Sequence, residues 1–399
     1  MLTGVWADLV GQEKAVEVLR RAAESQPGRS SHAMSHAWLI TGPPGSGRSN
    51  AAKAFAAALQ CVDHGCGQCN ACRTALSGAH PDVTLVRTEA LSIGVDEVRE
   101  LVRRAAMNPV HGCHQVVVVE DADRITERGA DALLKAIEEP APKTVWLLCA
   151  PTPEDVIVTI RSRCRRLHLA TPRDEAVAAL LTRRDGVAPE VAAEAARAGQ
   201  GHIGRARRLA WDEEARARRN AIGELPTRLR SLGDCLQGAE DIVNQASEAA
   251  AAATAEVNAA ERAELEKALG FGSSGARPRN AQAALRDLEK QQSARLKRLQ
   301  RDALDRVLTE LTAYHRDVLA IQTGAVRPEE EHALRGARRV HAGWSASLHR
   351  IADSQSPEHT VATIDAILAA RKSLEHGVTP LLVMETLLIA MTGVDRARW

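Results

Sequence analysis

ITGPPGSGRS, residues 40–49, follows the apolar run 37–40 and precedes the alanine-rich segment 50–59. The apolar run predicts a short buried strand, and the alanine-rich segment predicts a helix. A glycine-rich loop between a strand and a helix is the context in which the pattern G-x-x-x-x-G-K-[ST] binds phosphate groups. Glycines let backbone N–H groups turn toward an anion, and the N-terminus of the next helix adds positive partial charge. The stretch therefore predicts an α/β domain organised around a phosphate-binding loop.

The predicted nucleotide site departs from this pattern because arginine, Arg48, stands where lysine would contact the phosphates. A guanidinium is a planar fork rather than a point charge, so it could pair with phosphate or fold back onto acidic residues. Ser49 can supply the hydroxyl that binds Mg²⁺, and Glu120 and Asp121 end a predicted strand where acidic residues would support the metal. We expect lost or severely weakened hydrolysis, and binding of ATP and Mg²⁺ in this loop without turnover stays open. The residues of this degenerate site are Val10, Gly42, Pro43, Pro44, Gly45, Ser46, Gly47, Arg48, Ser49, Glu120 and Asp121.

Further strands and helices alternate along the first 170 residues. Apolar runs predict strands at 83–86, 115–119, 144–149 and 164–169. Apolar residues at helical spacing predict helices at 95–107 and 130–139, the second ending before Pro140. Alternating strands and helices favour a doubly wound α/β domain over residues 1–170.

Four cysteines lie within twelve residues: Cys61, Cys66, Cys69 and Cys72. Four thiolates match the tetrahedral ligand set of a structural Zn²⁺ site, which leaves no open position for catalysis. A redox pair formed by Cys69 and Cys72 is the competing interpretation, and it explains only two of the four. The other four cysteines are scattered and are expected to be buried as small hydrophobic residues: Cys113, Cys149, Cys164 and Cys235.

Arginines gather around Ser162-Arg163-Cys164, with Arg161, Arg165 and Arg166 beside them. The simplest interpretation is a solvated run of charge. The sharper one is an arginine finger, in which Arg163 reaches the γ-phosphate bound by a neighbouring subunit. Such a residue contributes roughly 10³–10⁵ in rate.

After residue 172 the pattern becomes helical, with short helices predicted at 174–183 and 189–198. The alanine-rich segments 239–269 and 281–319 predict a helical hairpin with a turn at 270–278. Long polar helices of this kind are usually spacers or partner-binding faces. The apolar segment 381–391 is expected to be a packed helix.

Composition limits the class of protein. The chain has 399 residues, a net charge of +1 and 2% aromatic residues, so no global basic field indicates nucleic acid. We find neither a signal-peptide pattern nor the roughly 20 apolar residues that a membrane helix needs. Clustered cysteines fit a reducing compartment. We therefore expect a cytoplasmic protein with no membrane partner.

Several separate stretches together resemble the clamp-loader subunits of the AAA+ family, most of all the delta-prime type of bacterial DNA polymerase III. They are Leu9-Val10-Gly11-Gln12, the loop 42–49, the cysteine insert followed by His80-Pro81-Asp82, the segment 132–140, and Ser162-Arg163-Cys164. The resemblance implies an AAA+ P-loop domain over 1–170 with a zinc-binding insert at 61–72. It further implies a small helical lid at 171–212 and an all-α collar at 213–399. The alanine-rich hairpin at about 239–300 lies outside the common pattern and is expected to be an insertion.

The resemblance also implies a place in the DNA polymerase III holoenzyme. Motor subunits and a delta-type subunit would complete a pentameric ring that loads the sliding clamp on primer–template DNA. Arg163 would complete the ATP site of the adjacent motor subunit. Zn²⁺ would be structural.

Four departures from a motor subunit favour a stator-like subunit whose own ATP turnover is negligible. Arg48 replaces lysine, Glu120-Asp121 reverses the expected Asp-Glu order, Ala150-Pro151 lacks the expected threonine, and Gly204-Arg205 replaces a Gly-Ser-like turn before the sensing arginine. Two alternatives stay open. One is an active ATPase motor of the same family. The other is a zinc-stabilised DNA-binding protein that uses the arginines of 161–166 and 205–208.

Overall fold

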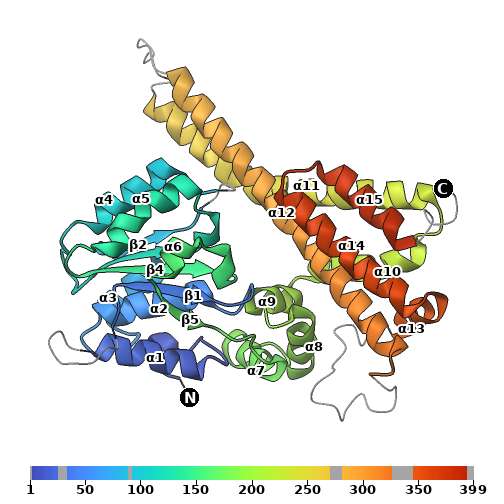
Figure 1. Cartoon of the computed structure of the whole chain (residues 1–399), viewed down its shortest axis with the longest axis horizontal. Helices are drawn as coiled ribbons and strands as arrows, with labels where there is room; N and C mark the ends of the chain where they lie inside the picture. Colours follow the sequence, from blue (N-terminus) through green and yellow to red (C-terminus); the bar gives the residue numbers. More distant parts are fainter. Residues whose placement is uncertain (1, 26–33, 89–91, 270–280, 326–344, 393–399) are drawn as a thin grey trace. The chain divides into compact units, whose positions relative to one another are not determined.

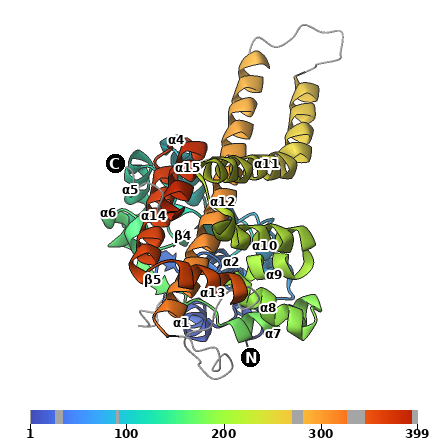
Figure 2. The same cartoon turned by 90° about the vertical axis from the view of Figure 1, so that its right-hand side faces the viewer.

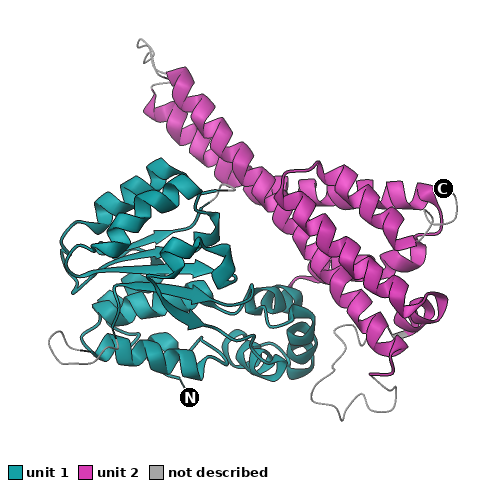
Figure 3. Cartoon of the chain, in the orientation of Figure 1, with its two compact units in different colours: residues 1–211 teal, residues 212–399 magenta. Residues whose placement is uncertain are grey.

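The computed structural model describes residues 2–25, 34–88, 92–269, 281–325 and 345–392. The chain divides into two units, residues 1–211 and residues 212–399, shown in teal and magenta in Figure 3. Each unit has its own core and is described by itself. Among the described helices, none combines the length and the apolar character that crossing a bilayer requires.

Unit 1 contains a parallel five-stranded sheet with the order β2-β3-β4-β1-β5 (Figure 1). Strand β1 pairs with β4 on one side and with the edge strand β5 on the other, so that Ile40 lies opposite both Cys149 and Leu167. All five predicted strands are confirmed, with shifts of one residue at the ends of some. Their bounds are β1 Ala37–Thr41, β2 Val83–Val86, β3 Gln115–Val119, β4 Thr144–Ala150 and β5 Arg165–His168.

Helices cover both faces of this sheet (Figure 1). The predicted helices in this unit are confirmed, and residues 153–161 form a 3₁₀ turn followed by a short helix. A helix that the sequence did not predict, α3, begins inside the cysteine cluster. The elements are η1 Gly4–Trp6, α1 Glu13–Glu24, α2 Arg48–Gln60, α3 Asn70–Ser77, α4 Val95–Ala105, η2 Ala122–Arg124, α5 Glu127–Glu138, η3 Pro153–Asp155, α6 Val158–Arg161, α7 Asp174–Asp185, α8 Pro189–Gly199 and α9 Ile203–Trp211.

Strand β1 is buried along its whole length because its alternating side chains enter two different cores. Trp38 and Ile40 pack with α1 and α2, whereas Ala37 and Leu39 pack with α4 and α5. Trp38 meets Phe55 of α2 edge to face, with ring centroids 5.3 Å apart. Helix α2 is enclosed as well, and its buried alanines are Ala51, Ala52, Ala54, Ala56, Ala57 and Ala58.

The turn before β3 is held by a buried carboxylate, Asp82, which ends the His80-Pro81-Asp82 motif. Asp82 accepts hydrogen bonds from the backbone N–H groups of Val110, His111 and Gly112 at 2.6, 2.8 and 2.6 Å. Burial acts to raise the pKa of Asp82, but these N–H groups outweigh it and the pKa lies below its ordinary value. Cys113 follows directly and is exposed, so its predicted burial was wrong, whereas the other three scattered cysteines are buried as predicted.

Unit 2 is built from helices, and its described residues contain no strand. Its helices are α10 Glu213–Arg228, α11 Leu232–Ala268, α12 Ala281–Gln322, α13 Ser345–Ser354, α14 Pro357–Glu375 and α15 Pro380–Thr392. Helices α11 and α12 confirm the two predicted arms of a helical hairpin, and their distal halves project beyond the rest of unit 2 (Figure 2). The turn expected at 270–278 lies outside the described residues.

A buried histidine, His315 of α12, lies in the interior of unit 2. Its side chain is 2% exposed, and neither ring nitrogen has a hydrogen-bond partner among the residues that the structure describes. It lines a small cavity of about 30 Å³ together with Pro226, Gln355 and Thr392. Burial, and secondarily the nearby His359, lowers the pKa of His315 to about 4. The neutral ring is therefore the form that the folded unit accommodates.

We expect acid to destabilise unit 2 through His315. The unfolded chain takes up a proton near pH 6.5, but the folded chain does so only near pH 4. The contribution of His315 to the free energy of unfolding is therefore fully present above pH 6.5. It falls as the pH is lowered, and the loss is on the order of 3 kcal/mol at pH 4. Thermal unfolding of the wild type and of His315→Gln, followed from pH 7.5 to pH 4.5, measures the effect.

The exposed His376 provides the control, because His376→Gln should keep the acid sensitivity of the wild type. Parallel pH profiles for the wild type and His315→Gln would contradict the assignment.

Candidate nucleotide and metal sites

The glycine-rich loop emerges from the carboxyl end of β1 and leads into α2. The N–H group of Gly42 donates to the carbonyl of Pro151, which follows β4, at 3.1 Å. A Cβ atom at Gly42 would lie 2.7 Å from the carbonyl oxygen of Leu169, so a larger residue would push the loop off the sheet. Gly47 has a φ of 93° and turns the chain into the first residue of α2. The predicted strand–loop–helix context is confirmed.

Gln12 connects this loop to the chain that follows strand β5. Its buried amide donates to the carbonyl of Ser46 at 3.3 Å and to that of Ala170 at 2.7 Å. Its Oε1 atom accepts a hydrogen bond from the N–H group of Ala170 at 3.1 Å. The Leu9-Val10-Gly11-Gln12 motif thus reaches both the loop and the end of β5. Val10 is itself half-buried in the preceding turn.

Arg48 is turned back onto its own loop. Its Nη1 atom donates to the carbonyl oxygen of Gly42 at 2.7 Å. Burial lowers the pKa of this guanidinium from its ordinary value, while Cys149, Asp123 and Asp121 act in the opposite direction. The sequence left two orientations open: toward a bound phosphate, or back onto acidic residues. The side chain of Arg48 does fold back, but its hydrogen bond is to the loop backbone at Gly42 and not to an acidic side chain.

The acidic end of β3 is neutralised by a residue that the sequence analysis missed. Lys53, on α2, forms an ion pair with Glu120 at 2.8 Å, and both side chains are largely buried. Glu120 is further fixed because its N–H group donates to the carbonyl of Val86. Asp121 follows as the residue before η2. The sequence does offer a signal for this role of Lys53. It is the one charged residue in the alanine-rich segment 50–59, and it lies five residues after Arg48.

His202, just before α9, lies directly against the loop and was also missed. A Cβ atom at Gly45 would lie 2.3 to 2.5 Å from atoms of His202, so only glycine fits beneath this histidine. The neighbouring Ser46 hydroxyl is buried and has no hydrogen-bond partner within the described part of the chain. Ser49 is half-buried in the first turn of α2, and Pro44 is exposed. The loop is therefore covered on one side by the segment that connects α8 to α9.

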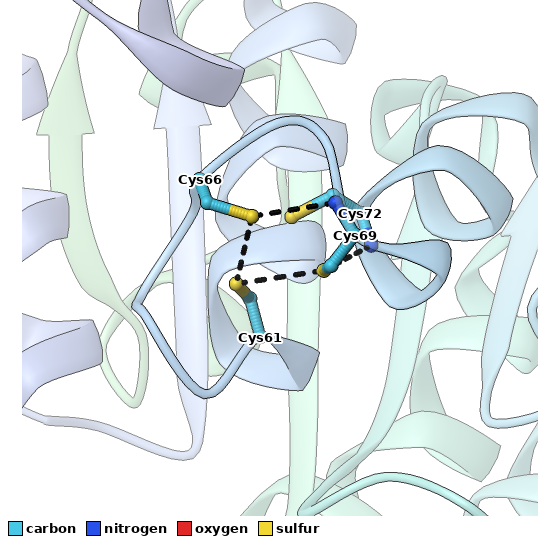
Figure 4. Close-up of side chains that lie close together, drawn as sticks. All are labelled: Cys61, Cys66, Cys69 and Cys72. Carbon is cyan, nitrogen blue, oxygen red and sulfur yellow. Dashed lines mark hydrogen bonds between the residues drawn. The ribbon is translucent and has the colours of Figure 1, made fainter.

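The four clustered cysteines converge on one point (Figure 4). Their four sulfur atoms lie within 4.8 Å of one another. The Sγ atom of Cys61 lies 3.7 Å from those of Cys66 and Cys69. Tetrahedral Zn²⁺ with Zn–S bonds of about 2.3 Å would separate its sulfurs by about 3.8 Å, so the spacing fits a metal ion. Cys61, Cys66, Cys69 and Cys72 could hold one.

Backbone N–H groups donate to these sulfurs, although burial raises the pKa of the Cys72 thiol above its ordinary value. Gly67, Cys69 and Cys72 each donate to a cysteine sulfur at 3.4 Å. Burial acts to raise the pKa of Cys61, but hydrogen bonds from the surrounding backbone and from Cys72 outweigh it and bring the pKa to about 7. Deprotonated thiols are the form that binds a metal.

The loop that carries the clustered cysteines, residues 61–72, also supports the first residues of unit 1. The N–H group of Val5 donates to the carbonyl of Gly65 at 3.1 Å. A Cβ atom at Gly65 would lie 2.8 Å from the Val5 side chain and 3.2 Å from the indole nitrogen of Trp6. Folding of the cysteine loop and docking of η1 are therefore coupled.

Arg163 stands at the surface beyond α6 and is 40% exposed. Its Nη2 atom forms an ion pair with Glu138 of α5 at 2.6 Å, and its Nη1 atom donates to the carbonyl of Thr159 at 2.8 Å. Three acceptors, with the Ser162 hydroxyl at 3.3 Å as the third, hold the guanidinium in one orientation.

Two other arginines of this cluster, Arg161 and Arg165, have partners of their own within the chain. Arg161 pairs with Glu154 at 3.6 Å, and the guanidinium of Arg165 lies over the Trp38 ring at 4.8 Å from its centroid. Near the end of unit 1, Arg207 pairs with Asp185 at 3.3 Å. These contacts divide the positive charge among separate acidic and aromatic partners.

Residues 11–173 match the family described as DNA polymerase III, delta subunit. Among curated proteins, subunit delta' of DNA polymerase III from Haemophilus influenzae is 38% identical over 35% of this chain and 44% of its own length. The subunit delta' from Escherichia coli is 33% identical over 49% of this chain and 59% of its own length. Subunit gamma/tau from Mycobacterium tuberculosis is 34% identical over 46% of this chain and 32% of its own length. The chain spans about half the length of the delta' relatives that it matches.

Replacing one clustered cysteine should release the metal and loosen the start of unit 1. Binding of a structural metal by cysteine ligands is worth about 10–16 kcal/mol in small zinc peptides, and it depends on the full ligand set. We expect Cys69→Ser to lower the metal content from about one equivalent to below about 0.2, and to lower the melting temperature. Elemental analysis and thermal unfolding measure both effects.

The exposed Cys113 gives a matched control, since Cys113→Ser removes a thiol outside the cluster. Unchanged metal content in Cys69→Ser would rule out the four-cysteine site.

Proposed function

We propose that this chain, for which the comparisons support a clamp-loader subunit of DNA polymerase III, is the non-motor, stator-like member of that assembly. Its own site would turn over ATP negligibly. It would supply Arg163 to the ATP site of a neighbouring motor subunit, and the assembly would load the sliding clamp onto primer–template DNA during replication.

The contacts within the loop support the first part of this proposal, that the chain's own site turns over ATP negligibly. A working site keeps a cation free for the β- and γ-phosphates and an acidic strand end free for Mg²⁺. Here Arg48 is hydrogen-bonded to the Gly42 carbonyl, and Lys53 neutralises Glu120. His202 covers the loop at Gly45. Productive binding of Mg²⁺-ATP would require breaking the Arg48–Gly42 hydrogen bond and the Lys53–Glu120 ion pair. Both contacts therefore oppose binding of Mg²⁺-ATP at this site.

The surface position of Arg163 supports the second part of the proposal, that this residue acts at the ATP site of a neighbouring subunit. An arginine that acts on a neighbour must reach solvent and must be held so that little rotamer entropy is lost on binding. Arg163 meets both conditions through its exposure and its three acceptors. Glu138, which holds it, belongs to the segment 132–140 that contributed to the resemblance.

The remaining parts receive roles by the same proposal. Residues 1–170 would be the AAA+ domain, with a structural Zn²⁺ on the four cysteines. Residues 171–212 would be its lid, and residues 213–399 the collar that joins motor subunits and a delta-type subunit into a pentameric ring. The hairpin at about 239–300 would be an insertion into that collar. A cytoplasmic location follows from a role in replication.

An active motor is the competing function, and the intact loop geometry is what favours it. The strand–loop–helix context, Gly42 and Gly47 are those of a phosphate-binding loop, and Ser49 stands at the Mg²⁺ position. A DNA-binding role for the arginines of 161–166 is less well supported, because Arg161, Arg163 and Arg165 each have another partner.

Turnover by the purified chain separates the stator from the motor. We expect no ATP hydrolysis above background in the wild type. Arg48→Lys should not restore it, because Lys53 would still neutralise Glu120 and His202 would still cover the loop. Phosphate release with Mg²⁺-ATP measures the rate, and a motor subunit serves as the positive control. Robust wild-type turnover would overturn the stator assignment.

The arginine finger is tested in the assembled complex with motor subunits, clamp and primed DNA. Arg163→Ala should leave assembly intact but remove most of the turnover at one ATP site, because a trans arginine is worth roughly 10³–10⁵ in rate. The exposed Arg166 is the matched control, and Arg166→Ala should hydrolyse ATP normally. Normal ATP hydrolysis by complexes that contain Arg163→Ala would show that the finger assignment is wrong.

A further inference from the structure

Helix α12 carries a row of cations along the half that projects from unit 2. Arg286, Lys290, Lys297 and Arg301 follow one another at intervals of four, seven and four residues. This spacing keeps side chains on one face of a helix. The first three are exposed and Arg301 is half-buried. The row, called here the cationic stripe, is about 22 Å long at 1.5 Å per residue.

The stripe faces away from the partner helix of the hairpin. The side of α12 that touches α11 is marked by Arg295, which pairs with Glu261 at 2.7 Å and with the Asn258 side chain at 2.7 Å. Gln292 on the same side donates to the carbonyl of Asn258 at 3.0 Å. Positions 292 and 295 lie across the helix from 290 and 297, so the packing of the hairpin leaves the stripe uncovered.

The same face of α12 changes character where the helix enters the helical bundle. Continuing from Arg301 by three and four residues, the face reaches Leu304 and Leu308, both of which are fully buried. These leucines belong to the same hydrophobic cluster as Ile367 and Leu374 of α14. The face is therefore apolar where α14 covers it and cationic where the hairpin projects beyond α14 (Figure 2). The stripe occupies the uncovered part alone.

Ion pairs reach only one of the four stripe cations in the described part of the chain, although the two arms together carry nearly equal numbers of cations and acids. Residues 281–301 contain six cations and two acids, and residues 247–268 of α11 contain two cations and five acids. Of those two acids, Glu289 pairs with Arg262 of α11. Asp287 pairs with Lys290 at 3.6 Å, the only ion pair that the described part of the chain gives to a stripe residue. The hairpin is thus basic on the α12 side and acidic on the α11 side.

We propose that the cationic stripe binds the phosphate backbone of double-stranded DNA. Cations on long side chains spaced about 6 and 10 Å apart along a straight helix can each reach a phosphate of a duplex, in which charge is dense and regular. The site is independent of the ATP chemistry proposed above, because none of its residues lies in unit 1.

Residues beside the stripe favour a duplex over other polyanions. The positions between its cations are small, Ser293 and Ala294, so they offer none of the apolar anchors that protein interfaces use. Single-stranded nucleic acid is usually bound by stacking bases on aromatic rings, and residues 281–301 contain no aromatic residue. What the stripe offers is charge alone, the means by which proteins bind a duplex without reading its sequence.

The test measures binding of the full chain to a fluorescent duplex of random sequence by anisotropy, over a series of salt concentrations. Replacing all four stripe residues with glutamine should weaken binding at least about tenfold at low salt. It should also lower the slope of log K against log salt by about 3.6, since each phosphate contact contributes about 0.9. The smaller variant Lys290→Gln/Lys297→Gln should lower the slope by about 2.

A control variant removes four exposed cations from α1 and α4 of unit 1: Arg20, Arg21, Arg99 and Arg103. It has the same net charge as the four-residue stripe variant, so a general charge effect would lower its slope equally. An unchanged slope in this control, with reduced slopes in both stripe variants, supports the proposal. Equal losses in control and stripe variants, or a stripe variant that binds duplex as the wild type does, would overturn it. In the second case an acidic protein segment would be the partner to examine.

Discussion

One buried amide, that of Gln12, joins three parts of unit 1 that are far apart in the sequence. It bonds to the glycine-rich loop through the Ser46 carbonyl and to the backbone after β5 through both polar atoms of Ala170. An unpaired amide buried at this point would cost about 1–3 kcal/mol, so the three partners hold one another in register. Together with the hydrogen bond from Gly42 to the Pro151 carbonyl, this contact sets the position of the loop relative to the sheet, on which the site contacts of the loop depend.

Within that frame the site balances its own charges. A nucleotide with Mg²⁺ normally brings anions to the loop cation and a cation to the acidic strand end. In this chain the Gly42 carbonyl takes the first role and the ammonium group of Lys53 takes the second. Glu138 similarly engages Arg163, the cation proposed to act outside the chain. The two arginines differ in exposure: Arg48 is held within the loop, and Arg163 is open to solvent.

Much of this fold could be predicted from the sequence because its strands are continuous apolar runs. Strand β3, with four consecutive valines, has no helical alternative once its neighbours are considered. The cysteine cluster was predicted for a similar reason, since its ligands are close in the sequence. Helix α3 was missed because it is short and begins among metal-ligand candidates rather than in an apolar pattern.

The contacts that define the state of the loop could not be predicted in the same way. Lys53 meets Glu120 and His202 meets Gly45 only because the chain folds back over long distances. Residue type also misled the prediction at Cys113, where the turn held by Asp82 and Gln60 keeps a small apolar residue at the surface. Local patterns predict elements, whereas charge pairing across elements depends on packing.

Alanine has two opposite roles in this molecule. In α2, the alanines between Ala51 and Ala58 set how closely the helix approaches the sheet, and hence where the loop at its N-terminus lies. In α11, Ala251, Ala252 and Ala253 are exposed and belong to none of the hydrophobic clusters of the described residues. A one-methylene enlargement would be resisted in α2 and accepted without effect on packing in α11. Natural sequence drift should therefore be slow in the first helix and fast in the second, although their compositions look alike.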